Sequence, residues 1–309
     1  LRLSLLDNMK ICAVVVTYNR KELLEKQIIE IMHNQELKID AYYVIDNCST
    51  DGTRALIDKY DGSVIKYCRT ESNCGGAGGF SYGLQCAFED KYDWYILMDD
   101  DGRPMDKECF GNMKRHIVKK GYDSQRPYLL NSLVLSDKDT LSFGLGHIES
   151  VTELNSVVTE NEVVDMINPF NGTWISNGLI EKIGFPNGKF FIKGDENDYL
   201  RRAQSTGAFV ATVVDSRYFH PKLGGYKKKK VFGKEMYVYI EPAWKEYYSV
   251  RNYTFSFLQF GEKKDAILFL IKRIYCCMVC NCNKLDVMKM LFKGYQDGKK
   301  GRLGATIKP

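Results

Sequence analysis

Residues 94–101 read Trp-Tyr-Ile-Leu-Met-Asp-Asp-Asp, so an apolar run is followed directly by three carboxylates. A short apolar and aromatic run is typical of a buried β-strand. Adjacent carboxylates repel one another, and a divalent cation relieves that repulsion, with oxygen ligands favouring Mg²⁺ or Mn²⁺. Because open α/β sheets bind ligands at the carboxyl ends of their strands, Asp99, Asp100 and Asp101 indicate a metal site. A solvated acidic turn is the alternative, since Gly-Arg-Pro follows.

The sequence on either side of this stretch alternates strand and helix patterns. Before it, strands are expected at residues 10–17, 42–45 and 64–67, and helices at residues 21–33, 53–60 and 81–90. Such alternation predicts a parallel, doubly wound α/β sheet. After it, we expect a strand at residues 189–193, a helix at 196–206, a loop at 227–230 and helical segments that include 266–294.

Composition and charge limit the class of protein. The 309 residues are 44% hydrophobic and 27% charged, as in an ordinary globular protein. From Lys222 onward there are 19 Lys and Arg against 7 Asp and Glu, a net charge of +12. The preceding residues carry 25 against 32, a net charge of −7. The basic C-terminal region favours an anionic partner such as a membrane surface, a nucleic acid or a phosphorylated lipid.

Cysteine usage and hydropathy bear on location. The ten cysteines show no regular pairing pattern, and several lie in apolar stretches, which predicts reduced thiols and a cytosolic protein. No apolar run approaches the ~20 residues that cross a bilayer, so no membrane span is predicted. Residues 1–9 are expected to be the remnant of a leader or an expression tag.

Two groups of residues lie where strands are expected to end. Thr17, Tyr18 and Arg20 follow the first strand, and Asp46 and Asn47 follow the second. In a parallel sheet these ends are adjacent, so Arg20 could pair with a diphosphate and Asp46 with a ribose or a base. A turn with a helix cap explains the second group equally well.

A glycine-rich motif follows the third expected strand. Residues 73–80 (NCGGAGGF) place four glycines before a helix. Gly75 and Gly76 could let the backbone approach an anion at the helix N-terminus, and a tight strand-to-helix turn is the alternative. The spacing matches neither a P-loop nor a dinucleotide fingerprint.

A second acidic motif and one histidine complete the candidate residues. Asp195, Glu196 and Asp198 open an expected helix, where the helix dipole favours carboxylates, so capping is one interpretation. The other is that one of them is a general base. His220 is one of only four histidines, and its imidazole could be structural or could complete a metal shell.

Taken together and in this order, the motifs resemble those of the GT-A fold glycosyltransferases of family 2. The matching blocks are V-V-V-T-Y-N-R, I-D-N-C-S-T-D-G-T, N-C-G-G-A-G-G-F, M-D-D-D-G-R-P, F-I-K-G-D-E-N-D-Y-L-R-R, F-H-P and Y-Y-S-V-R-N, spread over residues 10–255. The glycine-rich and triple-aspartate blocks look most like the galactofuranosyltransferase and rhamnosyltransferase branch.

The resemblance implies roles for individual residues. Asp99 and Asp101 match the D-x-D pair that holds Mn²⁺ or Mg²⁺, and His220 matches an additional metal ligand. Glu196, paired with Asp195, matches the catalytic base. The nucleotide-sugar-binding residues implied by the blocks are Thr17, Tyr18, Arg20, Asp46, Asn47, Asn73, Gly75, Gly76, Asp99 and Asp100. Trp174, Asn177 and Asp198 are weaker candidates for acceptor binding, and Gly194 stands where the branch often has Trp.

The implied fold is a GT-A, Rossmann-like, mixed and mainly parallel sheet flanked by helices, with a C-terminal helical extension. We expect a catalytic domain at residues 10–225, with a nucleotide-sugar half (10–102) and an acceptor half (103–225), and a basic helical region at 226–309. That region has the mixed apolar and basic character of helices that lie on an anionic membrane surface. Packing against the domain or a second subunit is the alternative.

The implied function is metal-dependent, inverting transfer of a sugar from a nucleotide diphosphate. The preferred donor is UDP-galactofuranose, with dTDP-rhamnose as the alternative, and the acceptor is a saccharide or lipid-linked glycan of a cell-surface polysaccharide. The expected location is the cytoplasmic face of the plasma membrane, with no nucleic-acid partner and a possible homo-oligomer. A nucleic-acid-binding protein and a non-catalytic nucleotide-sugar or glycan-binding relative are the competing hypotheses.

Overall fold

The computed structural model describes residues 9–60, 62–222, 227–231 and 234–307. The chain divides into two compact units. Unit 1 contains Leu1–Asn73, Gly79–Pro186 and Tyr199–Lys222, and unit 2 contains Cys74–Gly78, Asn187–Asp198 and Leu223–Pro309. Residues 1–8 of the predicted remnant lie outside the described residues, and the predicted domain bounds stay a prediction.

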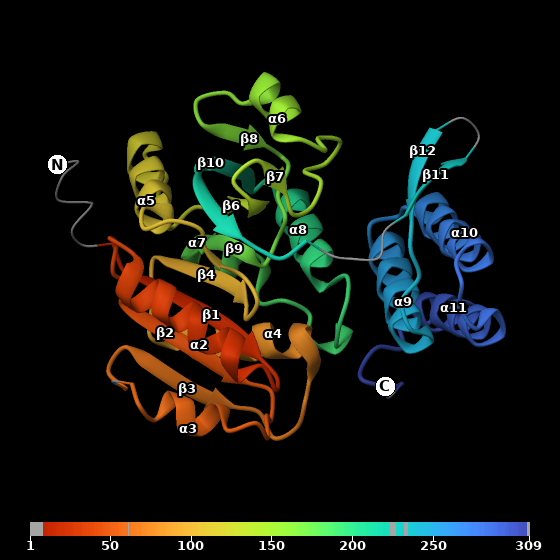
Figure 1. The fold of residues 1–309 in the computed structure, drawn as a ribbon, viewed down its shortest axis with the longest axis horizontal. Coiled ribbons are helices and arrows are strands. Elements are labelled where there is room, and N and C mark those ends of the chain that lie inside the picture. The colour runs from red at the N-terminus through yellow and green to blue at the C-terminus, as the bar shows by residue number, and fades with distance from the viewer. Residues whose placement is uncertain (1–8, 61, 223–226, 232–233, 308–309) are drawn as a thin grey trace. The chain divides into compact units, whose positions relative to one another are not determined.

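Unit 1 contains a mixed ten-stranded sheet (Figure 1). Its main path runs β3 (Ile65–Arg69), β2 (Ala41–Asp46), β1 (Ile11–Thr17), β4 (Trp94–Asp99), β9 (Asn171–Ser176), β6 (Tyr128–Asp137), β10 (Phe209–Phe219) and β5 (Arg103–Pro104). The first four strands are parallel, whereas β9 runs antiparallel to both of its neighbours. β7 (Thr140–Leu141) pairs with β6, and β8 (Glu162–Val164) pairs with β10. The predicted α/β fold with a mixed sheet is confirmed.

Helices cover both faces of this sheet. Alternate residues of a strand point to opposite faces, and in β1 Ala13 and Val15 join one buried cluster while Cys12 and Val14 join another. The helices of the first cluster are α2 (Lys21–Ile29), α3 (Thr53–Ile57) and α5 (Cys109–Lys120). Those of the second are α4 (Gly75–Glu89), α7 (Asn177–Ile183) and α8 (Asp195–Ser205). Burial on both faces explains why β1 is apolar throughout.

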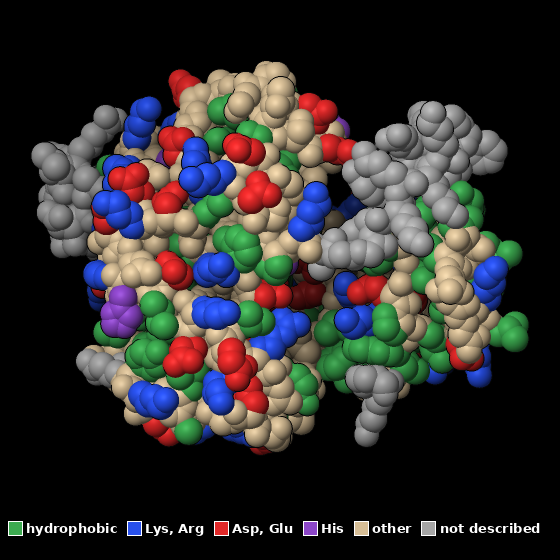
Figure 2. Space-filling model, viewed as in Figure 1, with side chains coloured by type: hydrophobic (Ala, Val, Ile, Leu, Met, Phe, Trp, Pro, Cys, Tyr) green, Lys and Arg blue, Asp and Glu red, His purple; other side chains and the backbone are tan. Residues whose placement is uncertain are grey.

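A smaller layer lies beside the main sheet. α6 (Val151–Val157) packs with β6, β7 and β8 through a third buried cluster, which includes Leu133, Leu141, Leu154 and Val163. On the face drawn in Figure 2, unit 1 interleaves acidic and basic side chains.

Local structure differs from the prediction at three places between residues 30 and 193. The helix expected at residues 81–90 begins earlier, at Gly75, so the glycine-rich motif forms its first turn. Residues 30–34, expected to continue α2, form the π-helical segment η1 (Glu30–Asn34). The strand expected at residues 189–193 is wrong: the 3₁₀ turn η2 (Gly188–Phe190) lies there, and Phe191 and Lys193 have positive φ, which a strand does not allow.

Unit 2 is built on three helices, α9 (Ala243–Gln259), α10 (Lys263–Val279) and α11 (Lys284–Lys299), with a hairpin of β11 (Lys227–Val231) and β12 (Lys234–Val238). The loop expected at residues 227–230 is therefore a strand. The helical segment expected at residues 266–294 is interrupted between α10 and α11, where Asn283 caps α11 by accepting from the Asp286 N–H. Among the described residues, no helix has both the length and the apolar character to cross a membrane.

Candidate active site

The ends of three strands in unit 1 gather polar side chains at one edge of the sheet. β1 pairs in parallel register with β2 and β4, so that Thr17 lies opposite Asp46 and Val16 opposite Asp99. Carboxyl ends of parallel strands meet at the same edge. The structure therefore brings together the residues that the sequence placed at separate strand ends.

Asp99, Asp101 and His220 form a cluster at this edge. Each offers one possible metal-ligating atom, and these atoms lie within 4.8 Å of one another. The Asp101 Oδ1 and His220 Nε2 atoms are 3.2 Å apart. Two carboxylates and an imidazole are ligands that suit Mn²⁺ and Mg²⁺ sites. The donor set therefore fits the divalent cation that the sequence predicts.

Local pairing explains why His220 lies beside Asp101. The two-residue strand β5 runs antiparallel to the end of β10, with Tyr218 opposite Pro104 and Phe219 opposite Arg103. This pairing places His220, which follows Phe219, next to the turn between β4 and β5, and Asp101 lies in that turn. A Cβ atom on Gly102 would collide with the Tyr218 ring, so this close approach requires glycine.

The hydrogen bonds of His220 orient its ring toward Asp101. Its Nδ1 atom lies 2.8 Å from the Pro221 carbonyl oxygen. A carbonyl can only accept, so Nδ1 carries the proton and Nε2 is the nitrogen that faces Asp101. Ser142 donates to the His220 carbonyl at 2.6 Å, and the Phe143 ring packs on the imidazole with centroids 4.9 Å apart.

The charges of this pair stabilise each other. Burial would lower the pKa of His220, but the hydrogen bond and charge of Asp101 outweigh burial and raise it. Burial would raise the pKa of Asp101, but His220 and Arg20 outweigh burial and lower it. A divalent cation needs an anionic Asp101 and a neutral imidazole, so it would compete with the proton that Asp101 stabilises on His220.

The third aspartate of the run has a different environment. The Asp100 side chain is buried, accepts from the Thr17 hydroxyl at 2.8 Å and accepts from Arg20 Nη1 at 3.0 Å. Burial raises its pKa, against the opposing effect of Arg20 and Thr17. The same Arg20 atom lies 3.2 Å from Asp101 Oδ2. Arg20 therefore offsets the repulsion among neighbouring carboxylates, and Asp100 anchors Arg20.

Gln27 is a residue of this site that the sequence analysis missed. Its amide nitrogen donates to the Asp99 carbonyl at 2.7 Å and to the Gly102 carbonyl, and its oxygen accepts from the Tyr42 hydroxyl. It thus fastens the turn that carries the aspartates to α2. The signal was available, because a buried polar residue interrupts the apolar stripe of Leu24, Ile28 and Ile31.

Asp46 is fully buried, and its carboxylate is used within the protein. It accepts from the Ser49 N–H at 2.7 Å, from Arg69 Nη1 at 2.8 Å and from the Tyr67 hydroxyl. Arg69 in turn donates to the Ser49 carbonyl at 2.9 Å. Tyr67 and Arg69, at the carboxyl end of β3, were also missed. Their position at the end of the neighbouring parallel strand was the available signal.

The glycine-rich motif serves three purposes. Gly75 has φ of +73°, and a Cβ atom there would overlap the Phe191 carbonyl, whose oxygen accepts from the Ala77 N–H at 3.1 Å. A Cβ atom on Gly79 would collide with Val16, which identifies this glycine as a close contact between α4 and the sheet. A Cβ atom on Gly76 would meet nothing within 4 Å, so the space on the Cβ side of this residue is open. Asn73 is the last residue of the first segment of unit 1 and directly precedes the part of the motif that belongs to unit 2.

In unit 2, the second acidic motif opens α8. Asp195 and Asp198 are buried, whereas Glu196 is partly exposed. Gly194, which precedes the motif, has φ of +82°. That conformation strains any residue with a Cβ atom, which explains why glycine and not Trp occupies this position here.

The structure does not place two of the weaker acceptor candidates at the edge that carries Asp99. Trp174 has no exposed surface and packs in the core of unit 1 against Trp94 and Phe110. Asn177 follows the end of β9, which is antiparallel to β4, and the neighbouring Ser176 pairs with Trp94 at the start of β4. Asn177 therefore lies at the opposite edge of the sheet from Asp99.

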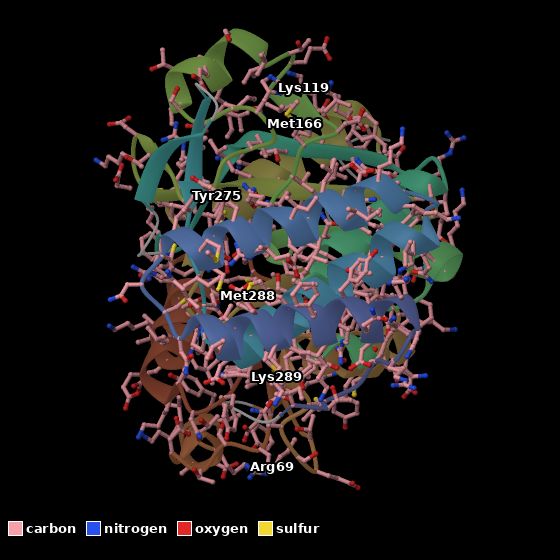
Figure 3. The ribbon with its side chains drawn as sticks, turned by 90° about the vertical axis from the view of Figure 1, so that its right-hand side faces the viewer. Arg69, Lys119, Met166, Tyr275, Met288 and Lys289 are labelled. Carbon is pink, nitrogen blue, oxygen red and sulfur yellow. The ribbon has the colours of Figure 1, made fainter. Side chains whose placement is uncertain are left out.

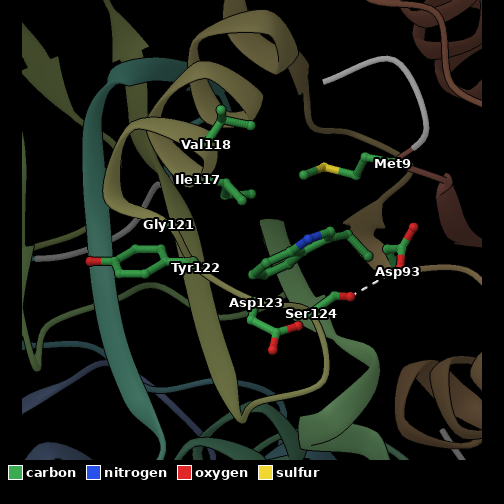
Figure 4. Close-up of a pocket in the computed structure, with 9 residues that line it drawn as sticks. Met9, Asp93, Ile117, Val118, Gly121, Tyr122, Asp123 and Ser124 are labelled. Carbon is green, nitrogen blue, oxygen red and sulfur yellow. Dashed lines mark hydrogen bonds between the residues drawn. The ribbon is translucent and has the colours of Figure 1, made fainter. Parts of the chain in front are cut away.

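A pocket of about 430 Å³ lies at that opposite edge (Figure 4). It is lined by Met9, Asp93, Trp94, Ile117, Val118, Gly121, Tyr122, Asp123 and Ser124. The Ser124 hydroxyl donates to Asp93 at 3.0 Å across one side of it. Because Trp94 begins β4 and Asp99 ends it, this pocket is separate from the Asp99 cluster.

The mixed sheet with helices on both faces is a GT-A fold. The chain resembles GalNAc-T7, solved with UDP, GalNAc and Mn²⁺, at a TM-score of 0.59 and 14% identity over 94% of this chain and 56% of that one. It also resembles the mannosyltransferase PcManGT from Pyrobaculum calidifontis, solved with GDP-Man and Mn²⁺, at a TM-score of 0.54 and 11% identity over 95% and 88% of the two chains. At these identities the likeness concerns the fold.

Sequence comparison then gives the family. Residues 12–125 match the family model described as Glycosyl transferase family 2. Galactofuranosyltransferase GlfT1 of Mycolicibacterium smegmatis is 29% identical over 264 residues, 82% of this chain and 85% of that protein. Abequosyltransferase RfbV of Salmonella typhimurium is 35% identical over 96 residues, 30% of this chain and 28% of that protein. The family model and these relatives support a family 2 glycosyltransferase on the branch that the sequence motifs predicted, and the chain is a glycosyltransferase.

Proposed function

We propose that this glycosyltransferase moves galactofuranose from UDP-galactofuranose to a saccharide or lipid-linked saccharide in cell-surface polysaccharide synthesis, with inversion and with Mn²⁺ or Mg²⁺. The observation that carries the metal dependence is the convergence of Asp99, Asp101 and His220 within 4.8 Å. The likeness to GlfT1 supports the sugar. The manganese named with two proteins of the same fold supports the cation.

The side chains of unit 1 would bind the donor. Asp99, Asp101 and His220 hold the cation, which when bound neutralises charge on the departing diphosphate. Among the proposed nucleotide-binding residues, Tyr18 is 45% exposed and the Arg20 side chain 52% exposed, so these two offer surface to a ligand. Asp46 is buried and acts through Arg69, which it orients.

The acidic motif of unit 2 would supply the base. Glu196 is the partly exposed member of the Asp195–Glu196 pair. In the proposed step it takes the proton of an acceptor hydroxyl while that oxygen bonds to the anomeric carbon. The bond from that carbon to the nucleotide diphosphate breaks on the opposite face, and UDP leaves with the bonding electron pair. Direct displacement of this kind inverts the anomeric configuration.

A nucleotide panel tests the donor and the metal. Thermal unfolding is measured with UDP, dTDP, GDP and CDP, each with and without Mn²⁺, because a ligand of the folded state raises apparent stability. Stabilisation by UDP only when Mn²⁺ is present is the expected result. Stabilisation by dTDP instead would favour dTDP-rhamnose as donor. No effect of any nucleotide would contradict the proposal.

We also propose that unit 2 contacts a membrane surface that carries the acceptor. α10 and α11 lie side by side (Figure 3), and apolar side chains lie among basic ones along them (Figure 2). The large exposed apolar residues of these two helices are Ile267, Leu268, Ile271, Met278, Leu285 and Phe292. The exposed basic residues on the same helices include Lys264, Lys272, Lys284, Lys289 and Lys293. Apolar side chains flanked by lysines suit an anionic lipid surface.

Vesicle co-sedimentation tests this contact. The protein is expected to sediment with phosphatidylglycerol vesicles at low salt and much less with phosphatidylcholine. Leu268→Ser with Leu285→Ser should weaken sedimentation, whereas Leu23→Ser, an exposed leucine of α2, should not. If vesicles do not bind and the same double variant changes the oligomeric state, the face contacts a second copy of the chain instead.

A further inference from the structure

The loop that leads into Asp195 has an unfavourable backbone conformation. Phe191 and Lys193 have φ of +67°, and Gly194 has φ of +82°. Non-glycine residues with positive φ are strained and persist only when their surroundings impose that conformation. Residues 189–194 must therefore be held by other parts of unit 2.

Asn252 of α9 is one of the groups that hold this loop. Its side chain is fully buried, and its amide nitrogen lies 3.0 Å from the Phe190 oxygen, 2.8 Å from the Ile192 oxygen and 2.7 Å from the Lys193 oxygen. One side-chain amide thus lies within hydrogen-bond distance of three carbonyls of the strained segment. The last of these carbonyls belongs to the residue two positions before Asp195.

Arg251 is the second such group, and its charge is fully buried. Its Nη2 atom donates to the Phe190 oxygen at 2.9 Å, its Nη1 atom to the Gly304 oxygen at 2.6 Å and its Nε atom to Asn252 Oδ1 at 2.8 Å. The guanidinium also lies 4.7 Å from the centroid of the Tyr248 ring. Burial lowers the pKa of Arg251. Burying a cation is costly, which makes a purely stabilising purpose a poor explanation.

The C-terminal segment completes the arrangement. The Gly304 N–H donates to the Lys189 oxygen at 2.7 Å, so Gly304 is bonded both to the loop and to Arg251. The Tyr248 hydroxyl donates to the Ile307 oxygen at 2.8 Å, and Tyr248 packs on the Phe191 ring with centroids 5.1 Å apart. Loop, helix α9 and C-terminal segment therefore form one bonded network within unit 2.

We infer that Arg251 and Asn252 are positioning residues for the Asp195–Glu196 pair. They fix residues 189–193 in the conformation from which α8 begins, and thereby fix where Glu196 presents its carboxylate. The inference rests on the proposed function, because Glu196 is the proposed base. It assigns a role to Arg251 and Asn252, which end the Y-Y-S-V-R-N block of the sequence.

Asn252→Asp is the decisive variant, because it keeps size and shape while replacing the donor with an oxygen that faces three carbonyls. We expect kcat to fall about 10²-fold, as for a misplaced catalytic group. KM for UDP-galactofuranose and the stabilisation by UDP with Mn²⁺ should change less than about threefold, because unit 1 binds them. If the wild type is active and Asn252→Asp has the same kcat, the inference is wrong.

Hydrogen exchange provides a readout that does not depend on turnover. Amides of residues 187–194 should exchange about tenfold faster in Asn252→Asp than in the wild type, because the bonds that hold the loop closed are lost. Equal exchange rates would contradict the positioning role even if the donor sugar has been assigned wrongly. Conversely, faster exchange in a protein without transferase activity would count against the proposed function alone.

Two further variants separate geometry from charge and from stability. Arg251→Lys keeps the charge, but an ammonium cannot reproduce the planar set of donors of the guanidinium. Its kcat should therefore fall. This variant replaces Asn252→Asp as the test if Asn252→Asp does not fold. Rescue by lysine would contradict the bridging geometry. Thr254→Val is the matched control on the same helix, because the buried Thr254 hydroxyl has no hydrogen-bond partner among the described residues. Its kcat should equal that of the wild type.

Discussion

Two polar clusters of this enzyme differ in how their hydrogen-bonding atoms are used. In unit 1, Asp99, Asp101 and His220 direct three ligand atoms of metal-binding kinds to within 4.8 Å of one another. In unit 2, the nitrogen atoms of Arg251 and Asn252 are bonded to carbonyl oxygens of the chain itself. The first cluster is partly exposed, with the Asp101 side chain 24% exposed, whereas both residues of the second are fully buried.

This difference separates groups that bind a ligand from groups that hold a shape. Neighbouring carboxylates destabilise the protein until a cation neutralises them, so variants of the first cluster should lose activity more than stability. A polar group whose partners are all within the protein leaves an unsatisfied partner when it is removed. Variants of such groups should therefore lose stability or geometry and keep the affinity for ligand.

The largest effect is expected for Asp101→Asn, which keeps the shape of a ligand-binding side chain but removes its charge. An amide is a weak ligand for a divalent cation, so turnover should fall about 10³-fold and the Mn²⁺-dependent stabilisation by UDP should disappear. The melting temperature without ligand should change little. Transfer rates and thermal unfolding with UDP and Mn²⁺ measure both.

Asp58→Asn is the control for this change, because Asp58 is an exposed aspartate of unit 1 that pairs with Arg54 on the surface. Its turnover should match the wild type. Retention of the manganese-dependent nucleotide effect in Asp101→Asn would break the comparison, because the first cluster would then not be a metal site.

Glu162 is a carboxylate of unit 1 whose oxygens are bonded to other side chains of the protein. Glu162→Gln should have the second largest effect. The buried Glu162 accepts from the Tyr122 hydroxyl at 2.6 Å and His116 Nε2 at 2.7 Å, and pairs with Lys120 at 3.0 Å. Removing one charge of a buried pair costs about 3 kcal/mol. We expect that loss in the free energy of unfolding, measured in urea, and unchanged transfer kinetics for the folded enzyme.

The difference in the free energy of unfolding between the wild type and Glu162→Gln should depend on pH, which gives a second test. Burial would raise the pKa of Glu162, but the bonds from Tyr122, His116 and Lys120 outweigh burial and lower it from the ordinary value of 4.5. A lowered pKa adds stability that is present above the unfolded pKa and is lost as the pH falls through the folded pKa. The advantage of the wild type over Glu162→Gln should be full at pH 7 and shrink below pH 4.5. A constant difference would contradict this origin.

Gln27→Met tests a residue between the two classes. The polar atoms of Gln27 are bonded within the protein, but they hold the turn that carries the candidate metal ligands. Methionine keeps the volume and loses the bonds to the Asp99 and Gly102 carbonyls. Groups that orient metal ligands typically contribute 10–100-fold in metal affinity, and we expect a loss of that size in Mn²⁺ titrations with UDP present. Gln85→Met, on the exposed face of α4, is the control. Unchanged manganese affinity would show that the turn keeps its geometry without Gln27.

Sequence patterns predicted the parts of this molecule that depend on local order. The apolar run of β4 and its aspartates were found from hydrophobicity alone, because a strand buried on both faces is apolar throughout. The residues alone left open whether His220 is structural or completes a metal shell, and the family resemblance implied that it lies beside the aspartates. That proximity depends on β5 and β10 pairing between residues more than a hundred positions apart, which no local pattern contains.

Where the prediction was wrong, a distant contact overrode the local signal. Residues 189–193 have strand-like composition, but the carbonyls of Phe190, Ile192 and Lys193 are bonded by Asn252 from α9. The direction of β9 is likewise invisible in its apolar sequence. That direction decides that Asn177 lies at the edge away from Asp99. Helix α4 begins at Gly75 because Gly75 fits against the Phe191 carbonyl, a contact that the composition of the motif does not reveal.

The smallest effect is expected for Tyr67→Phe. This variant tests whether Asp46 and its partners bind a ligand or hold the shape of the protein. The Tyr67 hydroxyl is one of three donors to Asp46, and Arg69 Nη1 and the Ser49 N–H remain in the variant. Losing one such bond costs about 1 kcal/mol in the free energy of unfolding. Because Arg69 keeps its carboxylate partner, the affinity for UDP should change less than about threefold. A much larger loss of UDP affinity would mean that Tyr67 itself contacts the nucleotide, and that the Asp46 group binds ligand as the Asp99 cluster does.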